Sequence, residues 1–169
     1  MNPSYLMQRL AHSAAAIDAL FDGIEAAQAR WKPAPERWSL LEVARHLLDE
    51  EREDFRARLR LTVERPESDW PAIDPQGWVV SRGYNEAELE TTVRDLMEER
   101  ERSLEWLRGL SVDWAVAHNH PVFGPMRAGD LLASWAAHDL LHIRQITRLL
   151  HDHAIAQAQP FDTGYAGGW

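Results

Sequence analysis

Cysteine is absent from the 169 residues of this sequence. Its absence excludes disulfides, thiolate metal sites and a cysteine nucleophile together, and it agrees with the cytoplasmic location that we expect. Long apolar runs are missing as well, and no stretch approaches the eighteen or so residues of a membrane span. The Ala-rich start lacks a basic segment followed by a continuous apolar one, so we interpret it as helix rather than as a leader.

Positive charge is scarce. The chain has 18 Lys and Arg against 27 Asp and Glu, a net charge of −9. A nucleic-acid-binding protein needs a basic patch or stripe, and none is visible, so we expect neither a nucleic-acid nor a membrane partner. With 45% hydrophobic and 27% charged residues the composition is ordinary, and the length suits one core. We therefore predict a single globular domain over residues 1–169.

Apolar residues recur at spacings of three and four along four long segments, which is the pattern of amphipathic helices. The predicted helices cover residues 3–29, 39–63, 85–110 and about 128–153. No segment convincingly predicts a strand and no repeat is visible. The sequence therefore predicts an all-α fold, a four-helix bundle.

Helix starts are marked by capping residues. Asn2 stands directly before a proline, which favours the first turn of a helix. Ser39 with Glu42, and Asn85 with Glu88, each match the capping-box pattern, in which side chain and backbone satisfy one another at the helix start. We expect the second and third helices to begin at these two boxes.

The connection between the second and third helices, residues 64–84, is unusually long for a compact domain. Two consecutive helices that run parallel need a connection that spans a whole helix, roughly 35 Å for 24 residues. Twenty extended residues reach about 66 Å, which is enough. The long crossover therefore favours an up-down-down-up arrangement over a simple meander.

The fourth helix carries two histidines on its apolar face. His138 and His142 lie four residues apart on the same stripe as Trp135 and Ile146. Imidazoles at this spacing point the same way and can share one metal ion. Eight histidines in the chain make such a pair unremarkable by composition alone, so two hydrogen-bonded core histidines are the alternative.

A third histidine, His46, lies at the edge of the apolar stripe of the second helix. Three neutral imidazoles converging from two helices would make an open site for zinc, nickel, manganese or iron. The acidic run around Asp49–Asp54 is interpreted as a solvated face, of which only Glu50, one turn beyond His46, could reach a metal or its water. Asp139 points away from its neighbour His138, so at most it could hydrogen-bond a metal-ligating residue without touching the metal itself.

The remaining histidines are weaker candidates. We expect His118 and His120, in a loop, and His151 and His153, at the end of the fourth helix, to be solvated, and His12 to lie on the surface. Aromatic residues in the Gly-rich tail predict that it docks onto the bundle; they are Phe161, Tyr165 and Trp169. Ser134 has no arrangement that would make it a nucleophile.

Two segments closely resemble the DinB-like (DinB/YfiT) superfamily: WSLLEVARHLLDEEREDF at residues 38–55 and AAHDLLHIRQITRLL at residues 136–150. WPAIDPQGW and HPVFGPM are similar to loops of the same family, and the resemblance extends over nearly the whole chain. It implies an up-down-down-up four-helix bundle with a divalent metal on three histidines. Those positions are His46, His138 and His142 here, although Asp139 and Leu141 replace a Glu and a His found in several relatives.

The resemblance also implies a range of functions. Members of the family often form homodimers, and some are S-transferases or isomerases that use a small thiol. Our leading hypothesis is a metal-dependent enzyme whose ion, with zinc or nickel ahead of manganese or iron, activates a small thiol or water. A dimeric stress-response or binding module without catalysis, with a structural metal or none, is the alternative.

Overall fold

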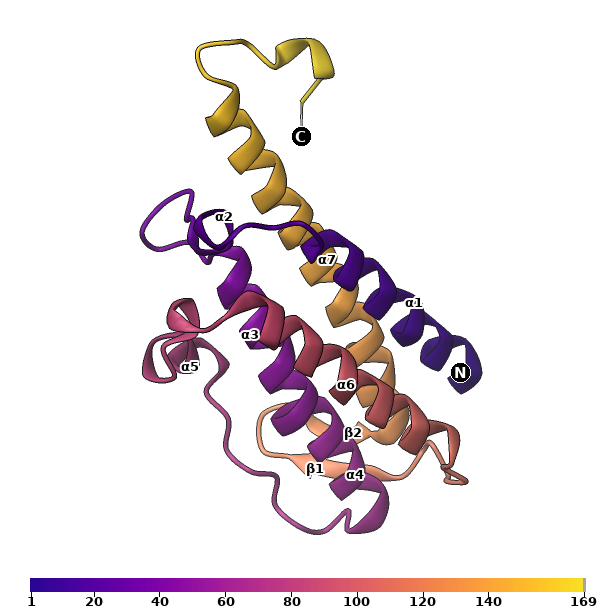
Figure 1. The fold of residues 1–169 in the computed structure, drawn as a ribbon. Coiled ribbons are helices and arrows are strands. Elements are labelled where there is room, and N and C mark those ends of the chain that lie inside the picture. Colours follow the sequence, from indigo (N-terminus) through magenta and orange to yellow (C-terminus); the bar gives the residue numbers. More distant parts are fainter. Residues whose placement is uncertain (169) are drawn as a thin grey trace.

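The computed structural model describes residues 1–168, and its four long helical segments pack side by side as a bundle (Figure 1). The first is α1 (Pro3–Phe21), followed by the short α2 (Ala26–Arg30). The second is built from α3 (Leu40–Asp49), a π-helical turn (Glu50–Phe55) and α4 (Arg56–Glu64). The third is α6 (Leu89–Arg108) and the fourth is α7 (Ala128–Ala158).

Shorter elements fill the connections. The crossover contains α5 (Pro75–Ser81) and a 3₁₀ turn (Tyr84–Glu86), and a hairpin of β1 (Ala117–His120) and β2 (Gly124–Arg127) precedes α7. A second 3₁₀ turn (Gly164–Ala166) lies in the tail. Among residues 1–168, no helix combines the length and the apolar character that a membrane span requires.

The second and third long helices run in the same direction. Ser39, the N-cap of α3, donates a hydrogen bond from Oγ to Oδ1 of Asn85, just before α6, at 2.6 Å. Farther along both helices, Arg56 of α4 meets Glu99 of α6 at 2.6 Å. The start of α3 thus lies beside the start of α6, and later residues of the two helices also lie side by side, so the helices are parallel. This confirms the predicted up-down-down-up bundle with its long crossover.

The first two helix starts agree with the sequence. Asn2 accepts a hydrogen bond from the backbone N–H of Tyr5 ahead of α1. The Ser39–Glu42 capping box is complete in both directions. The box predicted at Asn85 is wrong, because α6 begins one turn later at Leu89. The side chain of Asn85 bonds Ser39 and a backbone carbonyl of α2 instead, so it ties loops together rather than capping a helix.

Two long helices are interrupted. The helix predicted over residues 3–29 ends at Phe21, because Gly23 adopts a φ of +71°, a left-handed conformation that breaks the helix and leads into α2. The helix predicted over residues 39–63 contains the π turn at Glu50–Phe55. Such turns insert extra residues into a helix without ending it, so hydrophobic spacing alone did not reveal it.

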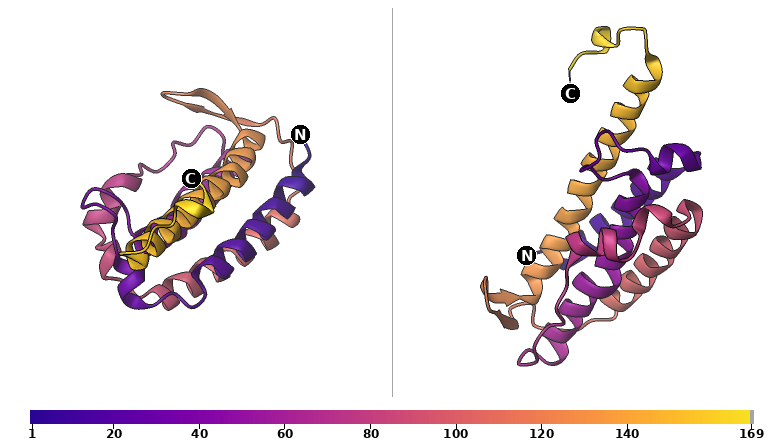
Figure 2. Two further views of the ribbon diagram at one scale, coloured as in Figure 1. Left: turned by 90° about the horizontal axis from the view of Figure 1, so that it is seen from above. Right: turned by 90° about the vertical axis from the view of Figure 1, so that its left-hand side faces the viewer.

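The hairpin and the tail differ from expectation. The prediction of no strand is wrong: β1 and β2 pair antiparallel through four residues each, a length too short to show an alternating pattern. Helix α7 continues five residues past His153, beyond the bundle (Figure 2). The expected docking of the tail is also wrong, since Phe161 is 76% exposed and Tyr165 fully exposed; Trp169 lies outside the described residues.

The interior holds two apolar clusters with a charged layer between them. One cluster includes Ile17, Leu48 and Leu96, and the other includes Leu10 and Leu104. Between the two clusters lies one buried ion network. Each long helix either contributes a side chain to this network or touches it. The layer thus lies at mid-height in the bundle, where it touches all four helices.

Arg100 is the centre of this layer. The guanidinium, in a residue only 3% exposed, bonds Asp139 of α7 at 2.6 and 2.9 Å and Glu51 of the π turn at 3.0 Å. It also donates to the carbonyl of Leu10 in α1 at 3.0 Å, while the indole of Trp135 donates to Glu51 at 3.1 Å. A charged group this deeply buried is tolerated only with such complete pairing.

The acidic run is therefore not a solvated face, contrary to the prediction. Asp49, Glu50 and Glu51 are each at most 5% exposed. Glu51 is held by Arg100, and Asp49 by Arg82 and Tyr84 at 2.7 and 2.6 Å. Their arginine partners lie on distant segments, which explains why the local sequence indicated a surface.

Substitution of Arg100 by methionine should lower the free energy of unfolding by about 3–5 kcal/mol, because it leaves two buried carboxylates without a counter-ion. Arg102→Met is the matched control, since that side chain is 60% exposed and should cost less than about 1 kcal/mol. Urea unfolding followed by circular dichroism measures both. Equal, small losses in the two variants would contradict the central role assigned to Arg100.

Candidate metal centre

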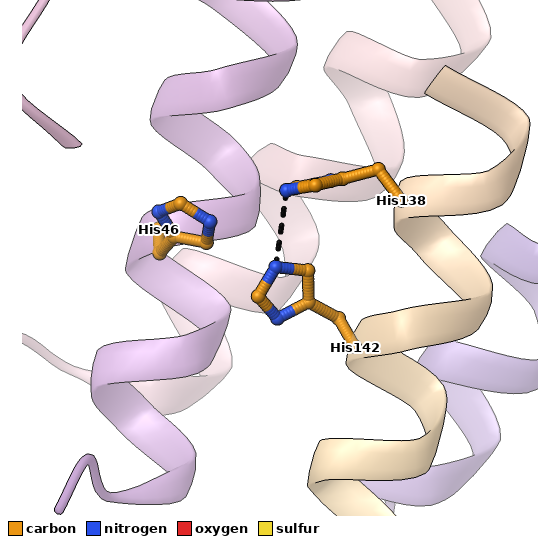
Figure 3. Close-up of side chains that lie close together, drawn as sticks. All are labelled: His46, His138 and His142. Atoms are coloured by element: carbon orange, nitrogen blue, oxygen red, sulfur yellow. Dashed lines mark hydrogen bonds between the residues drawn. The ribbon is translucent and has the colours of Figure 1, made fainter. Parts of the chain in front are cut away.

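Helices α3 and α7 bring three histidines to one point (Figure 3). His46 projects from α3 toward His138 and His142, which stand one turn apart on α7. One ring nitrogen of each lies within 4.8 Å of the others, and the Nε2 atoms of His138 and His142 are 3.1 Å apart. The structure thus unites the three candidates that the sequence had placed on two separate helices.

Aromatic rings enclose the cluster. The ring of Phe55 lies 5.0 Å from that of His138, and the ring of Trp38 lies 5.0 Å from that of His46, measured between centroids. His46 and His142 are only 5% and 9% exposed. Because these contacts fix the imidazoles and exclude water from one side, the rings are held in place before any ligand arrives.

Burial keeps the three imidazoles neutral. It lowers the pKa of His46 to about 3, with a further decrease from the nearby His142. The pKa of His138 is likewise lowered to about 3, first by burial and then by His142, His46 and Arg100. Burial lowers the pKa of His142 too. All three rings therefore offer a lone pair at neutral pH, as a metal ligand must.

Gln145 orients His142. Its Oε1 lies 2.8 Å from Nδ1 of His142, so this nitrogen carries the proton and leaves the Nε2 lone pair facing His138. Partners of this kind fix the tautomer of ligating histidines in metal proteins. Gln145 was not among the residues predicted from the sequence, although its position three residues after His142, on the same helix face, is a signal that could have identified it.

The cluster fits a divalent ion. In tetrahedral zinc sites the Zn–N distance of about 2.0–2.1 Å separates two ligand nitrogens by roughly 3.3 Å, close to the 3.1 Å between the two Nε2 atoms here. Nδ1 of His46 is buried without a hydrogen-bond partner, which is costly unless another species supplies one. The two Nε2 atoms also form a hydrogen bond with each other, so it is the third neutral ring, with its unsatisfied Nδ1, that favours a metal site over two hydrogen-bonded core histidines.

An open pocket of about 480 Å³ leads to the histidines. Its rim is formed by residues 36–38 ahead of α3 and by Pro75 and Gln76 at the start of α5. The three histidines, Gln145 and Glu50 line the inside. Three protein ligands beside an accessible pocket are typical of catalytic rather than structural zinc sites, which are closed by four ligands.

Glu50 is the buried carboxyl group of this pocket, whereas Glu36 at the rim is exposed. Glu50 is 5% exposed, and burial raises its pKa to about 8, with further increases from the neighbouring Asp54 and Asp49 that outweigh the opposing charge of Arg58. Glu50 and Asp54 lie within hydrogen-bonding reach, a contact that requires a proton shared between them. The prediction that Glu50 is the member of the acidic run nearest the site agrees with this position.

Asp139 does not support the histidines. Although it follows His138 in the sequence, it is 1% exposed and its two oxygens bond Arg100. Burial raises its pKa, opposed by Arg100. Its contribution to the site is indirect, because the ion pair fixes the rotation of α7 about its own axis.

The remaining histidines lie apart from the centre. His118 was expected to be solvated, but it is 6% exposed, donates from Nδ1 to the carbonyl of Pro66 at 3.1 Å and stacks on Trp70 at 4.3 Å. It therefore fastens the hairpin to the crossover. His120, also expected to be solvated, is half-buried and closes the hairpin turn through two backbone N–H groups.

At the end of α7, His151 and His153 are also half-buried rather than solvated, and the ring of His153 lies 5.2 Å from that of Trp31. His12 is exposed, as predicted. Among the described residues, the three-histidine group is the only set of His, Asp or Glu side chains close enough together to hold a metal ion.

Comparison with known proteins agrees with this architecture. A model of the DinB superfamily matches residues 9–146. Among solved structures, YfiT from Bacillus subtilis superimposes with a TM-score of 0.79 at 19% sequence identity, over 90% of this chain and 87% of that one. YfiT is described as "a probable metal-dependent hydrolase with an unusual four-helix bundle topology". At this identity the likeness concerns the fold, and no curated protein matches the chain.

The metal-free protein should lose stability as the pH falls from about 6.5 toward 3. The folded-state pKa values of His46 and His138 lie near 3, below the unfolded value of 6.5, so the unfolded chain binds more protons in this window. Each histidine that stays neutral contributes a slope of about 1.4 kcal/mol per pH unit. Urea titrations at several pH values test this, and His46→Gln should flatten the curve, whereas His12→Gln should leave it unchanged.

Replacement of Gln145 by leucine should weaken metal binding by about 10- to 100-fold, because His142 loses the acceptor that fixes its tautomer. Calorimetric titration of the metal-free protein with Zn²⁺ measures the effect. Gln157→Leu, near the exposed end of the same helix, is the control. Unchanged affinity in Gln145→Leu would show that Gln145 does not orient a ligand.

Proposed function

The chain belongs to the DinB superfamily, and we propose that it is a metal-dependent hydrolase with His46, His138 and His142 as the ligands of a divalent ion. The observation that carries the proposal is the convergence of three buried, neutral imidazoles at the inner end of an open pocket. The description of YfiT as a metal-dependent hydrolase supports the same class of reaction. Zinc or nickel is expected ahead of manganese or iron, because a given nitrogen site binds manganese and iron more weakly in the Irving–Williams order.

A divalent ion bound there would supply Lewis-acid chemistry, polarising an electrophile and lowering the pKa of a nucleophile at neutral pH. The chain itself supplies the rest. The histidines hold and orient the ion, Phe55 packs behind His138 outside the pocket, and the rim residues, Trp38 among them, receive the substrate. Since the chain has no cysteine, its nucleophile must come from outside.

Water is the nucleophile we propose, and a small thiol, which would make the protein an S-transferase, is the competing choice. Turnover of activated esters and amides without any added thiol supports hydrolysis. Strict dependence on an added thiol, with the thioether as product, would replace hydrolysis by S-transfer. A homodimer, a cytoplasmic location and the absence of nucleic-acid partners also stay predictions.

Metal analysis decides whether the site exists. The wild-type protein should bind about one divalent ion per chain, and the double variant His138→Ala, His142→Ala should bind none, because one ligand cannot hold the ion. His12→Ala, an exposed histidine on α1, should retain full occupancy. The same sub-stoichiometric metal in the wild type and the double variant would overturn the proposal.

Chelation separates a catalytic ion from a structural one. A structural site contributes much of the folding free energy, so removal of its metal should lower the melting temperature strongly. Here the histidines are already packed against aromatic rings, so we expect only a small shift on treatment with a chelator. A large drop would favour the non-catalytic alternative, a binding module with a structural metal.

A further inference from the structure

Glu50 is the one buried charged residue of the pocket, and no partner has been assigned to it. It lines the same cavity as the three histidines and is 95% buried, since only 5% of its surface is exposed. Its Oε1 is buried, and no hydrogen-bond donor of the protein reaches it. Asp54 lies within reach, but a second carboxyl group can bond Glu50 only when one of the pair carries a proton.

Neighbouring buried carboxylates differ from Glu50 in having an arginine of their own. Asp49 is bonded by Arg82 at 2.7 Å, and Glu51 by Arg100 at 3.0 Å. Asp54 is paired with Arg58 at 2.9 Å.

Within residues 1–168, no arginine or lysine lies close enough to Glu50 to form an ion pair like those of its neighbours. Burial of a carboxyl group without a cationic partner is costly, and such groups require another reason to be where they are.

The backbone fixes the direction of Glu50. Its N–H closes the last turn of α3 on the carbonyl of His46, so Glu50 stands one helical turn from that histidine and on the same face. Consecutive residues of a helix point about 100° apart, so the next residue, Glu51, is directed away from the pocket and bonds Arg100. Neighbouring positions thus hold a structural glutamate and one that lines the pocket.

We propose that Glu50 is not a metal ligand but the group that accepts a hydrogen bond, and then a proton, from the nucleophile entering this pocket. The inference rests on the proposed function. Glu50 is absent from the set of ligand atoms that lie within 4.8 Å of one another, whereas its unpartnered oxygen is an acceptor in the same cavity. The ligand expected in this pocket is a small molecule that carries an O–H or N–H group next to the atom that binds the metal.

With water as the nucleophile and Glu50 in its ionised form, the step balances without a further reactant. The water oxygen bonds to the electrophilic carbon as one of its O–H bonds breaks, and the proton passes to the carboxylate of Glu50. The bond from that carbon to the leaving group then breaks, and Glu50 returns the proton to the leaving group. Asp54 is a positioning residue in this scheme, because it interacts with Glu50 and does not line the pocket.

Zinc binding tests whether Glu50 is a ligand. Calorimetric titration of metal-free Glu50→Gln with Zn²⁺ should give an affinity within threefold of the wild type, because the three histidines are intact. Glu98→Gln, an exposed glutamate of α6, is the control for loss of a negative charge. A loss greater than tenfold in Glu50→Gln alone would make Glu50 a ligand and overturn the proposal.

Two small probes test the acceptor role without turnover. Acetohydroxamate binds metals while presenting N–H and O–H groups, whereas azide binds metals with no proton to donate. Affinity of the Zn²⁺-loaded protein for acetohydroxamate should fall about tenfold or more in Glu50→Gln, and affinity for azide should stay the same. Equal affinities of wild type and Glu50→Gln for acetohydroxamate would overturn the proposal.

Hydrolysis of p-nitrophenyl acetate by the Zn²⁺-loaded protein adds a kinetic readout. In Glu50→Gln, the loss of proton transfer should reduce kcat by about 100-fold or more with little change in KM. A variant as active as the wild type would contradict the role of Glu50 even if the hydroxamate affinity fell. Failure of the wild type itself to bind Zn²⁺ is a separate outcome, which would refute the proposed function and, with it, this inference.

Discussion

The ion network around Arg100 is the constraint on which the rest of the structure depends. One guanidinium joins the carbonyl of Leu10, the carboxylate of Glu51 and both oxygens of Asp139, so it touches every long helix. Apolar packing alone tolerates small rotations of a helix about its axis, whereas bidentate hydrogen bonds do not. Because Asp139 lies between His138 and His142, the pairing that holds it toward Arg100 also turns the two histidines toward α3.

The network and the metal centre divide the polar groups of the bundle between structure and chemistry. At the start of the π turn, Glu51 faces the Arg100 layer and Glu50 faces the pocket. Arginines neutralise the structural carboxylates, while the pocket keeps neutral histidines and a carboxyl group with a raised pKa. Two buried polar atoms that lack a partner within the protein, Nδ1 of His46 and Oε1 of Glu50, therefore belong to residues that line the pocket, where a metal and a substrate could supply one.

Several predictions that depended on local patterns succeeded, although the capping box at Asn85 did not, and the prediction for the acidic run, which depended on distant partners, failed. The Ser39–Glu42 capping box and the HxxxH motif of α7 involve residues one turn apart, so the sequence contained all the information. The acidic run looked solvated because Arg82 and Arg100, which neutralise Asp49 and Glu51, lie 33 and 49 residues away. The hairpin escaped notice because four-residue strands carry no usable periodicity.

By itself the sequence determined the four-helix bundle, its parallel second and third helices and the three candidate ligands, because helix periodicity and connection length are local properties of the chain. Only the tertiary structure decided that the three imidazoles meet, that Gln145 orients one of them, and that Glu50 shares their pocket. These facts depend on the rotation of α7 against α3. The buried pairing of Asp139 with Arg100, 39 residues apart in the sequence, restrains that rotation.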